Sequence, residues 1–201
     1  MKIFFDLDGT LLDSRERLYL LFQHLVPGSR FSFDGYWELK RNKINHAEIL
    51  QRYFSYSWEQ IDHFEKTWLA KIEEPEWLAM DIPFDGVSSF LQSLEKEHDL
   101  YLVTARQFET RVREQISLYG WDPVFKKIFV TGPGREKYDV LAPFTGSSSD
   151  WMVGDTGKDI QAGKKLGIRT AAVASGFLSR EKLLEYQPDV IAENVLALKF
   201  I

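Results

Sequence analysis

Carboxylates follow the first apolar run of the chain at close spacing. The segment FFDLDGTLLDS, residues 4–14, sets Asp6 and Asp8 two residues apart, with Asp13 close behind them. Two unit charges about 4 Å apart repel by about 4 kcal/mol at an effective dielectric constant near 20. Carboxylates clustered in this way take up protons or separate unless a cation holds them. The stretch is therefore a candidate for metal binding or acid–base chemistry.

Later segments place further polar groups at or just after the ends of apolar runs. Thr104 ends one such run, Lys137 follows another, and Asp155 and Asp159 lie within VGDTGKDI, residues 153–160. Taken singly, each has a simpler explanation as a turn, a helix cap or a solvated side chain. Oxygen-only ligands favour a hard ion, and a site that keeps positions for water and phosphate favours Mg²⁺ over Ca²⁺. Together with a lysine and a threonine, such a site suits a phosphoryl group.

The elements that must position these groups alternate along the chain. Short apolar runs are typical of parallel strands covered on both faces. The predicted strands are residues 2–6, 100–105, 127–132, 150–155, 169–175 and, from a weaker pattern, 189–194. Helical patterns occupy residues 85–97, 108–119 and 158–166, the last ending at Gly167. The alternation predicts an α/β fold with a doubly wound parallel-sheet core, in which ligands bind at the carboxyl ends of the strands.

One region interrupts the alternation. Residues 14–81 show helical periodicity, many aromatic side chains and no convincing strand. We therefore expect an inserted all-α domain over 14–81, within a core domain made of residues 1–13 and 82–201. Asp13 and Ser14 then mark where the chain leaves the core. The aromatic residues are expected to form the small core of the insert rather than to contact a substrate.

Composition narrows the class of protein. The 201 residues are 44% hydrophobic and 27% charged, as in a globular protein, and include no cysteine that could form a disulfide or a thiolate metal site. The net charge of −5, without a basic block, argues against a nucleic-acid partner. No apolar run reaches the roughly 18 residues of a membrane span. We expect no signal segment at the N-terminus, because Asp6 and Asp8 interrupt the early apolar stretch. We expect a cytoplasmic protein without a membrane partner; its oligomeric state stays open.

Rival motifs do not fit. Gly157 and Lys158 are followed by Asp159 rather than by serine or threonine, so they do not form a phosphate-binding P-loop. A serine-hydrolase G-x-S-x-G elbow is absent from the sequence. The histidines show no metal-binding spacing, and we expect them to be surface residues: His24, His46, His63 and His98.

Four motifs in order resemble those of the haloacid dehalogenase superfamily. DLDGTLLDS (6–14) is similar to its first motif, DxDGT, and VGDTGKDI (153–160) to its acidic GDxxxD motif. Between them, Thr104 stands where the family has a serine or threonine, and Lys137 where it has a lysine. The order and spacing of the two acidic motifs are specific. The likeness points to the phosphoglycolate phosphatase-like and β-phosphoglucomutase-like branch, and implies that the insert is a helical cap.

The resemblance implies a role for each matched residue. Asp6 would be the nucleophile that forms an aspartyl-phosphate, and Asp8 the general acid and then the general base. Thr104, the amide of Ala105 and Lys137 would hold the phosphoryl oxygens. The implied ligands of Mg²⁺ are the Asp6 carboxylate, the Asp8 main-chain carbonyl, and the carboxylates of Asp155 and Asp159.

The sequence departs from the family pattern near the phosphate-binding residues. Tyr138 follows the lysine where the family often has proline, and Lys126 and Lys127 are possible stand-ins for that lysine. Ala105 stands where the family often has asparagine, and it is followed by Arg106. We expect Arg106 to be a surface residue. These changes affect the identity of the substrate more than the class of reaction.

The leading prediction is a Mg²⁺-dependent phosphatase acting on a small phosphorylated metabolite. A phosphosugar mutase would use the same groups and return the phosphoryl group to the bound intermediate. A binding module that keeps the fold and has lost turnover is the alternative from another class. Removal of a halide is disfavoured, because Asp8 supplies an acid–base group that dehalogenation does not need there.

Overall fold

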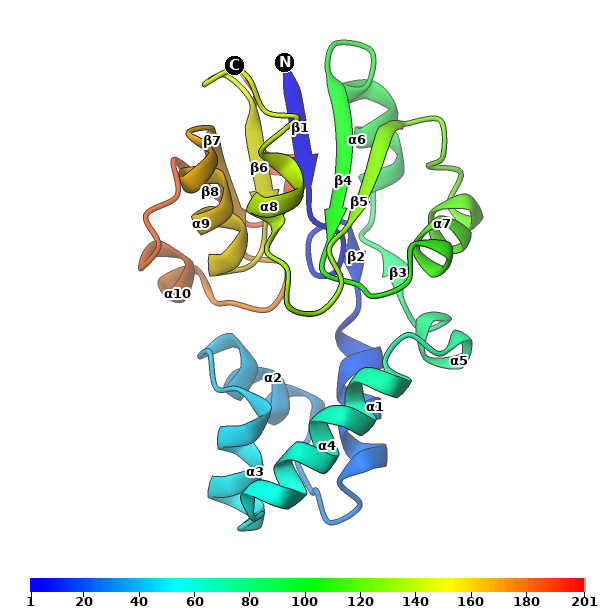
Figure 1. The fold of residues 1–201 in the computed structure, drawn as a ribbon, viewed down its shortest axis with the longest axis vertical. Helices are drawn as coiled ribbons and strands as arrows, with labels where there is room; N and C mark the ends of the chain where they lie inside the picture. The colour runs from blue at the N-terminus through cyan, green and yellow to red at the C-terminus, as the bar shows by residue number, and fades with distance from the viewer. Residues whose placement is uncertain (201) are drawn as a thin grey trace. The chain divides into compact units, whose positions relative to one another are not determined.

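The computed structural model describes residues 1–200, which divide into two compact units (Figure 1). The first unit contains Met1–Asp13 and the chain from Pro83 onward, and the second contains Ser14–Ile82. Each unit has its own buried side chains and is described by itself. None of the helices among residues 1–200 is both long and apolar enough to cross a membrane.

A parallel sheet forms the centre of the first unit. Six of the described strands pair in the order β5-β4-β1-β6-β7-β8, and every pairing is parallel. Their bounds are β1 Lys2–Phe5, β4 Asp99–Thr104, β5 Phe125–Val130, β6 Trp151–Gly154, β7 Arg169–Val173 and β8 Val190–Ala192. The predicted α/β class with a doubly wound parallel sheet is confirmed. Each expected strand is present within a few residues of its predicted bounds.

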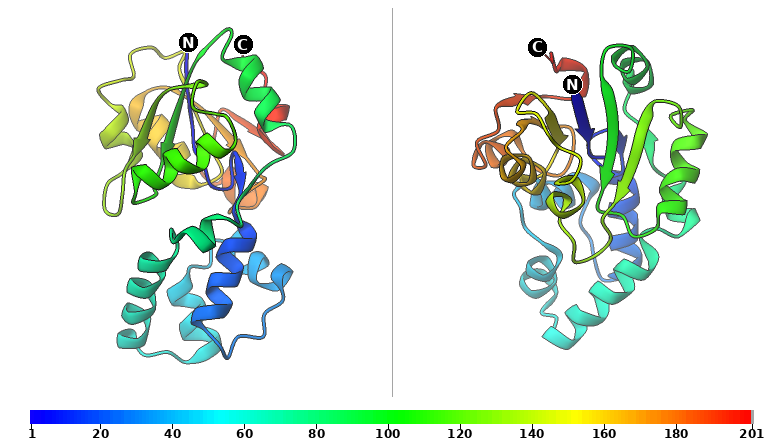
Figure 2. Two further views of the ribbon diagram at one scale, coloured as in Figure 1. Left: turned by 90° about the vertical axis from the view of Figure 1, so that its right-hand side faces the viewer. Right: turned by 45° about the horizontal axis from the view of Figure 1, so that its top comes forward.

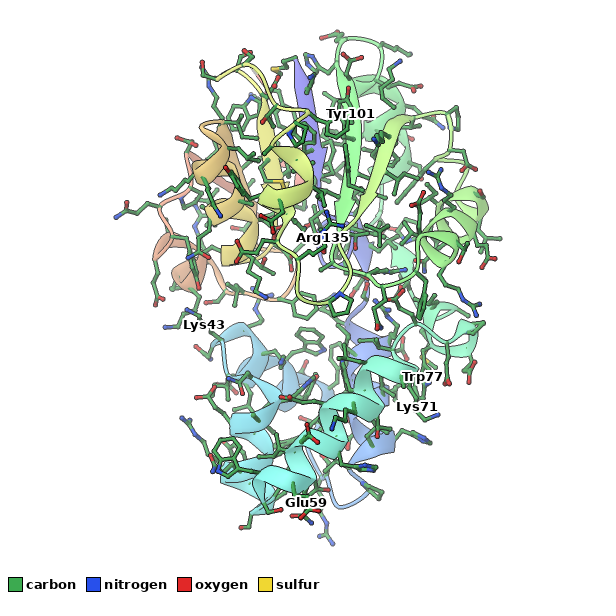
Figure 3. The ribbon with its side chains drawn as sticks, in the orientation of Figure 1. Lys43, Glu59, Lys71, Trp77, Tyr101 and Arg135 are labelled. Carbon is green, nitrogen blue, oxygen red and sulfur yellow. The ribbon has the colours of Figure 1, made fainter. Side chains whose placement is uncertain are left out.

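Helices pack on both faces of this sheet (Figures 1 and 2). Alternate residues of β1 point to opposite faces, so Ile3 and Phe5 belong to one buried cluster and Phe4 to another. The first cluster includes side chains of α6 (Val87–Leu94) and α7 (Glu109–Leu118), and the second includes Leu141 of α8 (Lys137–Leu141). On the second face Tyr101, labelled in Figure 3, stacks on Phe4 at 5.0 Å between ring centroids. The helical elements of this unit are α6 Val87–Leu94, α7 Glu109–Leu118, α8 Lys137–Leu141, α9 Gly157–Leu166, α10 Arg180–Leu184 and η1 Val195–Ala197.

The strand order reverses between β1 and β6. From β1 the chain runs to β4 and β5 on one side, and then to β6, β7 and β8 on the other. Phe5 is in register with Leu102 on one side and Val153 on the other, so β1, β4 and β6 end near the same level. Such a reversal leaves a crevice at the carboxyl ends, where ligands of doubly wound sheets bind.

A short ribbon that the sequence pattern did not predict connects the ends of the insert. β2 Leu12–Asp13 pairs with β3 Ile82–Pro83 in a two-stranded sheet, and the Phe84 N–H donates to the Leu11 carbonyl at 3.1 Å. Two residues are too few for a periodic pattern to be recognised. The ribbon therefore lies where the sequence indicated only loops.

Apart from Ile82 at the start of β3, the regular elements of the second unit are helices, in keeping with the helical periodicity of residues 14–81. Its helices are α1 Arg15–Leu25, α2 Phe33–Arg41, α3 His46–Phe54, α4 Trp58–Lys71 and α5 Pro75–Leu78. Asn45 and Glu48 form a reciprocal capping box at the start of α3, and Ser57 and Gln60 form another at α4. These local signals explain why two helices begin where they do.

Aromatic rings fill the interior of the second unit. Phe22 is fully buried and lies 5.0 Å from Tyr36, 5.6 Å from His46 and 6.0 Å from Phe64 between ring centroids. His46 also lies 4.3 Å from Trp68, and its Nε2 is 2.8 Å from the Tyr36 hydroxyl. Burial lowers the pKa of His46 well below its usual value, and Lys40 lowers it further. The expectation of a surface histidine is therefore wrong for His46.

The remaining histidines and aromatic residues follow the expectations in part. His24 and His63 are exposed, whereas His98 is partly buried and lies in the first unit, not in the insert. Of the aromatic residues of the insert, Tyr36, Trp37 and Phe64 are buried, and Tyr53 and Trp58 are exposed. Contact between these rings and a substrate stays untested.

Candidate active site

Asp6 is the first residue after β1 and stands at the reversal of strand order. Its main-chain N–H donates to the Val153 carbonyl at 2.9 Å, which continues the pairing with β6 beyond the strand. The side chain is buried: Oδ1 accepts a hydrogen bond from Lys137 Nζ, and Oδ2 lies 3.4 Å from Thr10 Oγ1. Asp6 is thus held at one position from both sides.

Two further buried carboxylates meet Asp6. Asp155 follows β6 directly, and Asp159 lies in the first turn of α9. One oxygen from each of Asp6, Asp155 and Asp159 lies within 4.8 Å of the others. Asp159 Oδ2 accepts from the N–H and the hydroxyl of Thr156, at 3.0 and 2.6 Å. Asp159 is therefore both a capping residue of α9 and a member of the cluster.

The loop after β7 completes the surroundings of Asp155. The Phe177 N–H donates to Asp155 Oδ2 at 2.6 Å, and a side chain at Gly9 or Gly176 would overlap the Asp155 carboxylate. Gly9 has a φ of 81°, which glycine adopts without strain. Sequence reasoning missed this loop. Its signal was the run of small residues in ASG, 174–176, after an apolar strand.

Lys137 is the cation at the cluster. It begins α8, and its Nζ donates to Asp6 Oδ1 and to Asp159 Oδ1, the latter at 2.6 Å. The side chain is 9% exposed, so the ammonium group is shielded from water. Lys126 and Lys127, the possible stand-ins, are exposed at the start of β5. Arg135, labelled in Figure 3, marks the loop that leads into α8.

The charges of the cluster are unbalanced, because three carboxyl groups face one ammonium group. Burial raises the pKa of Asp6 from 3.8 to about 6; Lys137 opposes this shift and Asp159 adds to it. Burial also raises the pKa of Asp155 well above its usual value, and the carboxylates of Asp6 and Asp159 add to that shift. For Lys137, burial favours a lower pKa, but Asp159 and Asp6 outweigh it and raise the pKa. A cation would stabilise the ionised form of this cluster.

Thr104, Ala105 and Asp8 lie at the ends of the neighbouring strands. Thr104 ends β4, is 1% exposed, and its Oγ1 accepts from the Arg106 N–H at 3.3 Å. Ala105 is exposed. Asp8 lies in the loop after β1, with its side chain 18% exposed. The structure thus places all of the sequence-predicted site residues at the carboxyl ends of β1, β4 and β6 or beside them, with Lys137 reaching in from α8.

The expectation that Arg106 is a surface residue is wrong. Arg106 is 5% exposed, and its Nε and Nη2 donate to the two carboxylate oxygens of Asp8 at 2.8 and 2.7 Å. Its Nη1 donates to Gln115 Oε1 at 2.5 Å. A charged side chain becomes buried in this way because both of its partners are buried or partly buried with it. Sequence reasoning missed Gln115, whose signal was a polar residue next to the apolar stripe of Val112 and Ile116.

The donor set of the cluster fits a hard divalent cation. Its atoms are all oxygens and they are buried, and burial raises the pKa of Asp6 and of Asp155, which favours a positive partner for their ionised forms. Asp6, Asp155 and Asp159 could hold such an ion, and Lys137 would share the same carboxylates. Beside the cluster, Thr104 offers a hydroxyl and Asp8 a carboxylate for proton transfer. This arrangement can bind an anion and attack it with a carboxylate.

Comparison with known proteins identifies the family. Residues 3–173 match the haloacid dehalogenase-like hydrolase family. The chain belongs to this family. The haloacid dehalogenase family and the class of enzyme that the motifs predict, a hydrolase, are therefore confirmed.

Haloacid dehalogenase-like relatives cover nearly the whole chain. A pyrophosphatase of Halalkalibacterium halodurans is 24% identical, over 96% of this chain and 92% of the relative. A 5′-nucleotidase of Pseudomonas aeruginosa is 25% identical, over 98% and 93%. Among solved structures, a haloacid dehalogenase-like hydrolase of Streptococcus pneumoniae gives a TM-score of 0.79 at 22% identity, covering 97% of this chain and 94% of that one. At this identity the solved structure shows that the fold is shared.

Proposed function

We propose that this haloacid dehalogenase-like hydrolase is a Mg²⁺-dependent phosphatase that hydrolyses a small phosphorylated metabolite. The observation that carries the proposal is the meeting of Asp6, Asp155 and Asp159 with Lys137 at the carboxyl ends of β1 and β6. Relatives described as a pyrophosphatase and a 5′-nucleotidase support a phosphate substrate.

Asp6 is the nucleophile in this proposal. One carboxylate oxygen attacks phosphorus, the bond to the leaving oxygen breaks, and an aspartyl-phosphate forms on Asp6. Thr104 Oγ1, the Ala105 amide and Lys137 Nζ hold the phosphoryl oxygens as negative charge shifts among them. Lys137 already contacts Asp6, so it is placed to serve the nucleophile and the phosphoryl group together.

Asp8 moves the protons. It gives a proton to the leaving oxygen in the first half of the reaction. In the second half it takes a proton from a water molecule, whose oxygen attacks phosphorus and breaks the bond to Asp6. Free phosphate leaves, and Asp6 is restored. The two carboxylates differ in surroundings, since Asp6 faces Lys137 and Asp8 faces Arg106.

A Mg²⁺ ion fits the remaining oxygens. Asp6, Asp155 and Asp159 would hold it, together with the Asp8 main-chain carbonyl. When bound, Mg²⁺ supplies positive charge that offsets both the carboxylates and the incoming phosphate. The buried, oxygen-only donor set and the raised pKa of Asp6 support its presence. The second unit would act as a cap that excludes water during phosphoryl transfer.

The test is a screen of phosphate esters with and without Mg²⁺. Inorganic pyrophosphate, nucleoside 5′-monophosphates, 2-phosphoglycolate and hexose phosphates are offered to the protein, and free phosphate is measured. We expect release that requires Mg²⁺ and stops in EDTA. Conversion of a hexose 1-phosphate to a 6-phosphate without phosphate release would favour a mutase instead. Failure to turn over any compound in the panel would favour a binding module.

A further inference from the structure

Arg106 holds the Asp8 carboxylate with two parallel hydrogen bonds. Nε donates to Oδ2 at 2.8 Å and Nη2 donates to Oδ1 at 2.7 Å. The Arg106 side chain is 4% exposed and that of Asp8 is 18% exposed, so little water competes for the pair. A two-ended contact between guanidinium and carboxylate fixes orientation as well as distance. The plane of the Asp8 carboxylate is therefore set by Arg106.

Arg106 is itself held from two sides. Gln115 of α7 accepts from Nη1 at 2.5 Å, and Gln115 is 4% exposed on the same helix as the fully buried Val112 and Ile116. A buried amide is costly unless it is hydrogen-bonded, and Arg106 is its partner. The Arg106 N–H donates to Thr104 Oγ1 at 3.3 Å. These contacts connect α7, the end of β4 and the loop after β1.

The hydrogen bonds also indicate which protonation state of Asp8 the contact with Arg106 supports. A guanidinium carries only donors, and both oxygens of Asp8 accept from it. An oxygen that carried a proton toward Arg106 would find no acceptor there. The contact therefore suits Asp8 as a proton acceptor, the role it has when water attacks the aspartyl-phosphate.

We propose that Arg106, held by Gln115, is a positioning residue that orients Asp8 for the second half of the reaction. The inference rests on the proposed function. In that step the water oxygen bonds to phosphorus, the bond from Asp6 to phosphorus breaks, and the water proton moves to Asp8. Arg106 acts through Asp8, because the structure shows its guanidinium bound to Asp8 and Gln115.

An aryl phosphate isolates this step. With p-nitrophenyl phosphate the leaving group departs with little need for a proton, so kcat/KM reports formation of the aspartyl-phosphate and kcat reports its hydrolysis. We expect Arg106→Met to lower kcat about 10- to 100-fold, less than the roughly 10²- to 10⁴-fold that a general acid or base contributes, because Asp8 itself is still present. The value of kcat/KM should stay within about threefold, with KM falling in parallel. A rapid burst of p-nitrophenol should precede slow turnover.

Three further variants define the contact. Arg106→Lys keeps the charge but not the two-ended contact, and should lose part of kcat. Gln115→Met removes the hydrogen bond that holds Arg106 to α7 and should show the same pattern to a smaller extent. It tests the same contact if Arg106→Met folds poorly. The matched control is Arg113→Met, because Arg113 lies on the same helix, is 53% exposed and pairs with Glu109. It should leave both constants unchanged.

A double variant decides whether Arg106 acts through Asp8. In an Asp8→Asn background, Arg106→Met should lower kcat by no more than about twofold, because the group that it positions is already gone. Losses that multiply, an equal fall in kcat and kcat/KM, or no loss in any Arg106 or Gln115 variant would each overturn the positioning role. A wild-type protein that releases no phosphate from any ester would overturn the proposed function itself, and the positioning role with it.

Discussion

Two buried clusters, one in each unit, differ in what their burial achieves. In the first unit, three carboxyl groups and one ammonium group meet at the ends of β1 and β6. In the second unit, Phe22 lies among the rings of Tyr36, His46 and Phe64. Burying apolar rings stabilises a fold, whereas burying several carboxylates opposes it. The burial of the aromatic cluster is favourable in itself. The burial of the carboxylate cluster is unfavourable unless a ligand offsets its charge.

The backbone around the two clusters differs in the same sense. The carboxylate cluster depends on specific main-chain contacts, such as the Phe177 N–H on Asp155 and the close approach of Gly9. The aromatic cluster relies on side-chain packing from four helices, with local capping boxes that start α3 and α4. A site that must hold charges in fixed positions needs such backbone contacts, while an apolar core tolerates rearrangement more readily.

Substitution in the carboxylate cluster should remove activity without unfolding the protein. Asp6→Asn takes away the nucleophile, and we expect phosphate release to fall more than about 10³-fold. The fold should stay intact, since asparagine has the same shape and the cluster loses a charge that was costly to bury. Steady-state phosphate release and circular dichroism check the two parts. Asp13→Asn, in the ribbon outside the cluster, is the control and should stay active; equal activity of both variants would contradict the assignment of Asp6.

Substitution in the aromatic cluster should do the reverse. Phe22→Ala removes a fully buried ring, and the free energy of unfolding should fall by about 3–5 kcal/mol. Urea unfolding followed by tryptophan fluorescence measures the loss. Trp58→Ala removes a larger ring that is 70% exposed in the same unit, so its effect should stay within about 0.5 kcal/mol. Similar losses for the two variants would show that the cluster around Phe22 does not stabilise the second unit.

The sequence predicts the parts of the molecule that local patterns determine. Each apolar run became a strand because a parallel sheet covered on both faces requires such runs. The proximity of the Asp6 and Asp155 carboxylates could also be predicted, because each comes directly after a strand and the carboxyl ends of these two strands lie side by side. Residues 14–81 lack a convincing strand pattern and show helical periodicity, and helices α1 to α5 lie within this stretch in the structure.

What escaped prediction depends on pairing between distant residues. From the sequence alone Arg106 is expected at the surface, because most arginines are exposed. The fold brings it into contact with Asp8, which is 98 residues away in sequence. Gln115 and the loop of Gly176 and Phe177 act on side chains that the sequence does not place near them. His46 was expected at the surface because histidine is polar, but its ring packs on that of Phe22. None of these contacts produces a period or a motif.

The two clusters should also differ in how the free energy of unfolding depends on pH, and this is the smallest of the expected effects. Burial raises the pKa of Asp6 to about 6 in the folded protein, above its ordinary value of 3.8. A carboxyl group with a raised pKa stabilises the fold while protonated, and this contribution is lost as pH rises from about 4 through about 6. In EDTA, Asp6→Asn should therefore gain stability over the wild type across this range, by up to about 3 kcal/mol. Urea unfolding of both proteins at a series of pH values between about 4.5 and about 7.5 measures the difference in their free energies of unfolding.

Two comparisons complete this test. Phe22→Ala removes no ionisable group, so its loss of stability should be nearly the same at every pH. Mg²⁺ should raise the stability of the wild type more at the higher pH, because it binds the ionised carboxylates, and should have little effect on Asp6→Asn. A difference between Asp6→Asn and wild type that did not change with pH would mean that the Asp6 carboxyl group is not costly to ionise in the folded state. That result would contradict the conclusion that the carboxylate cluster, unlike the aromatic cluster, needs a bound cation to offset its charge.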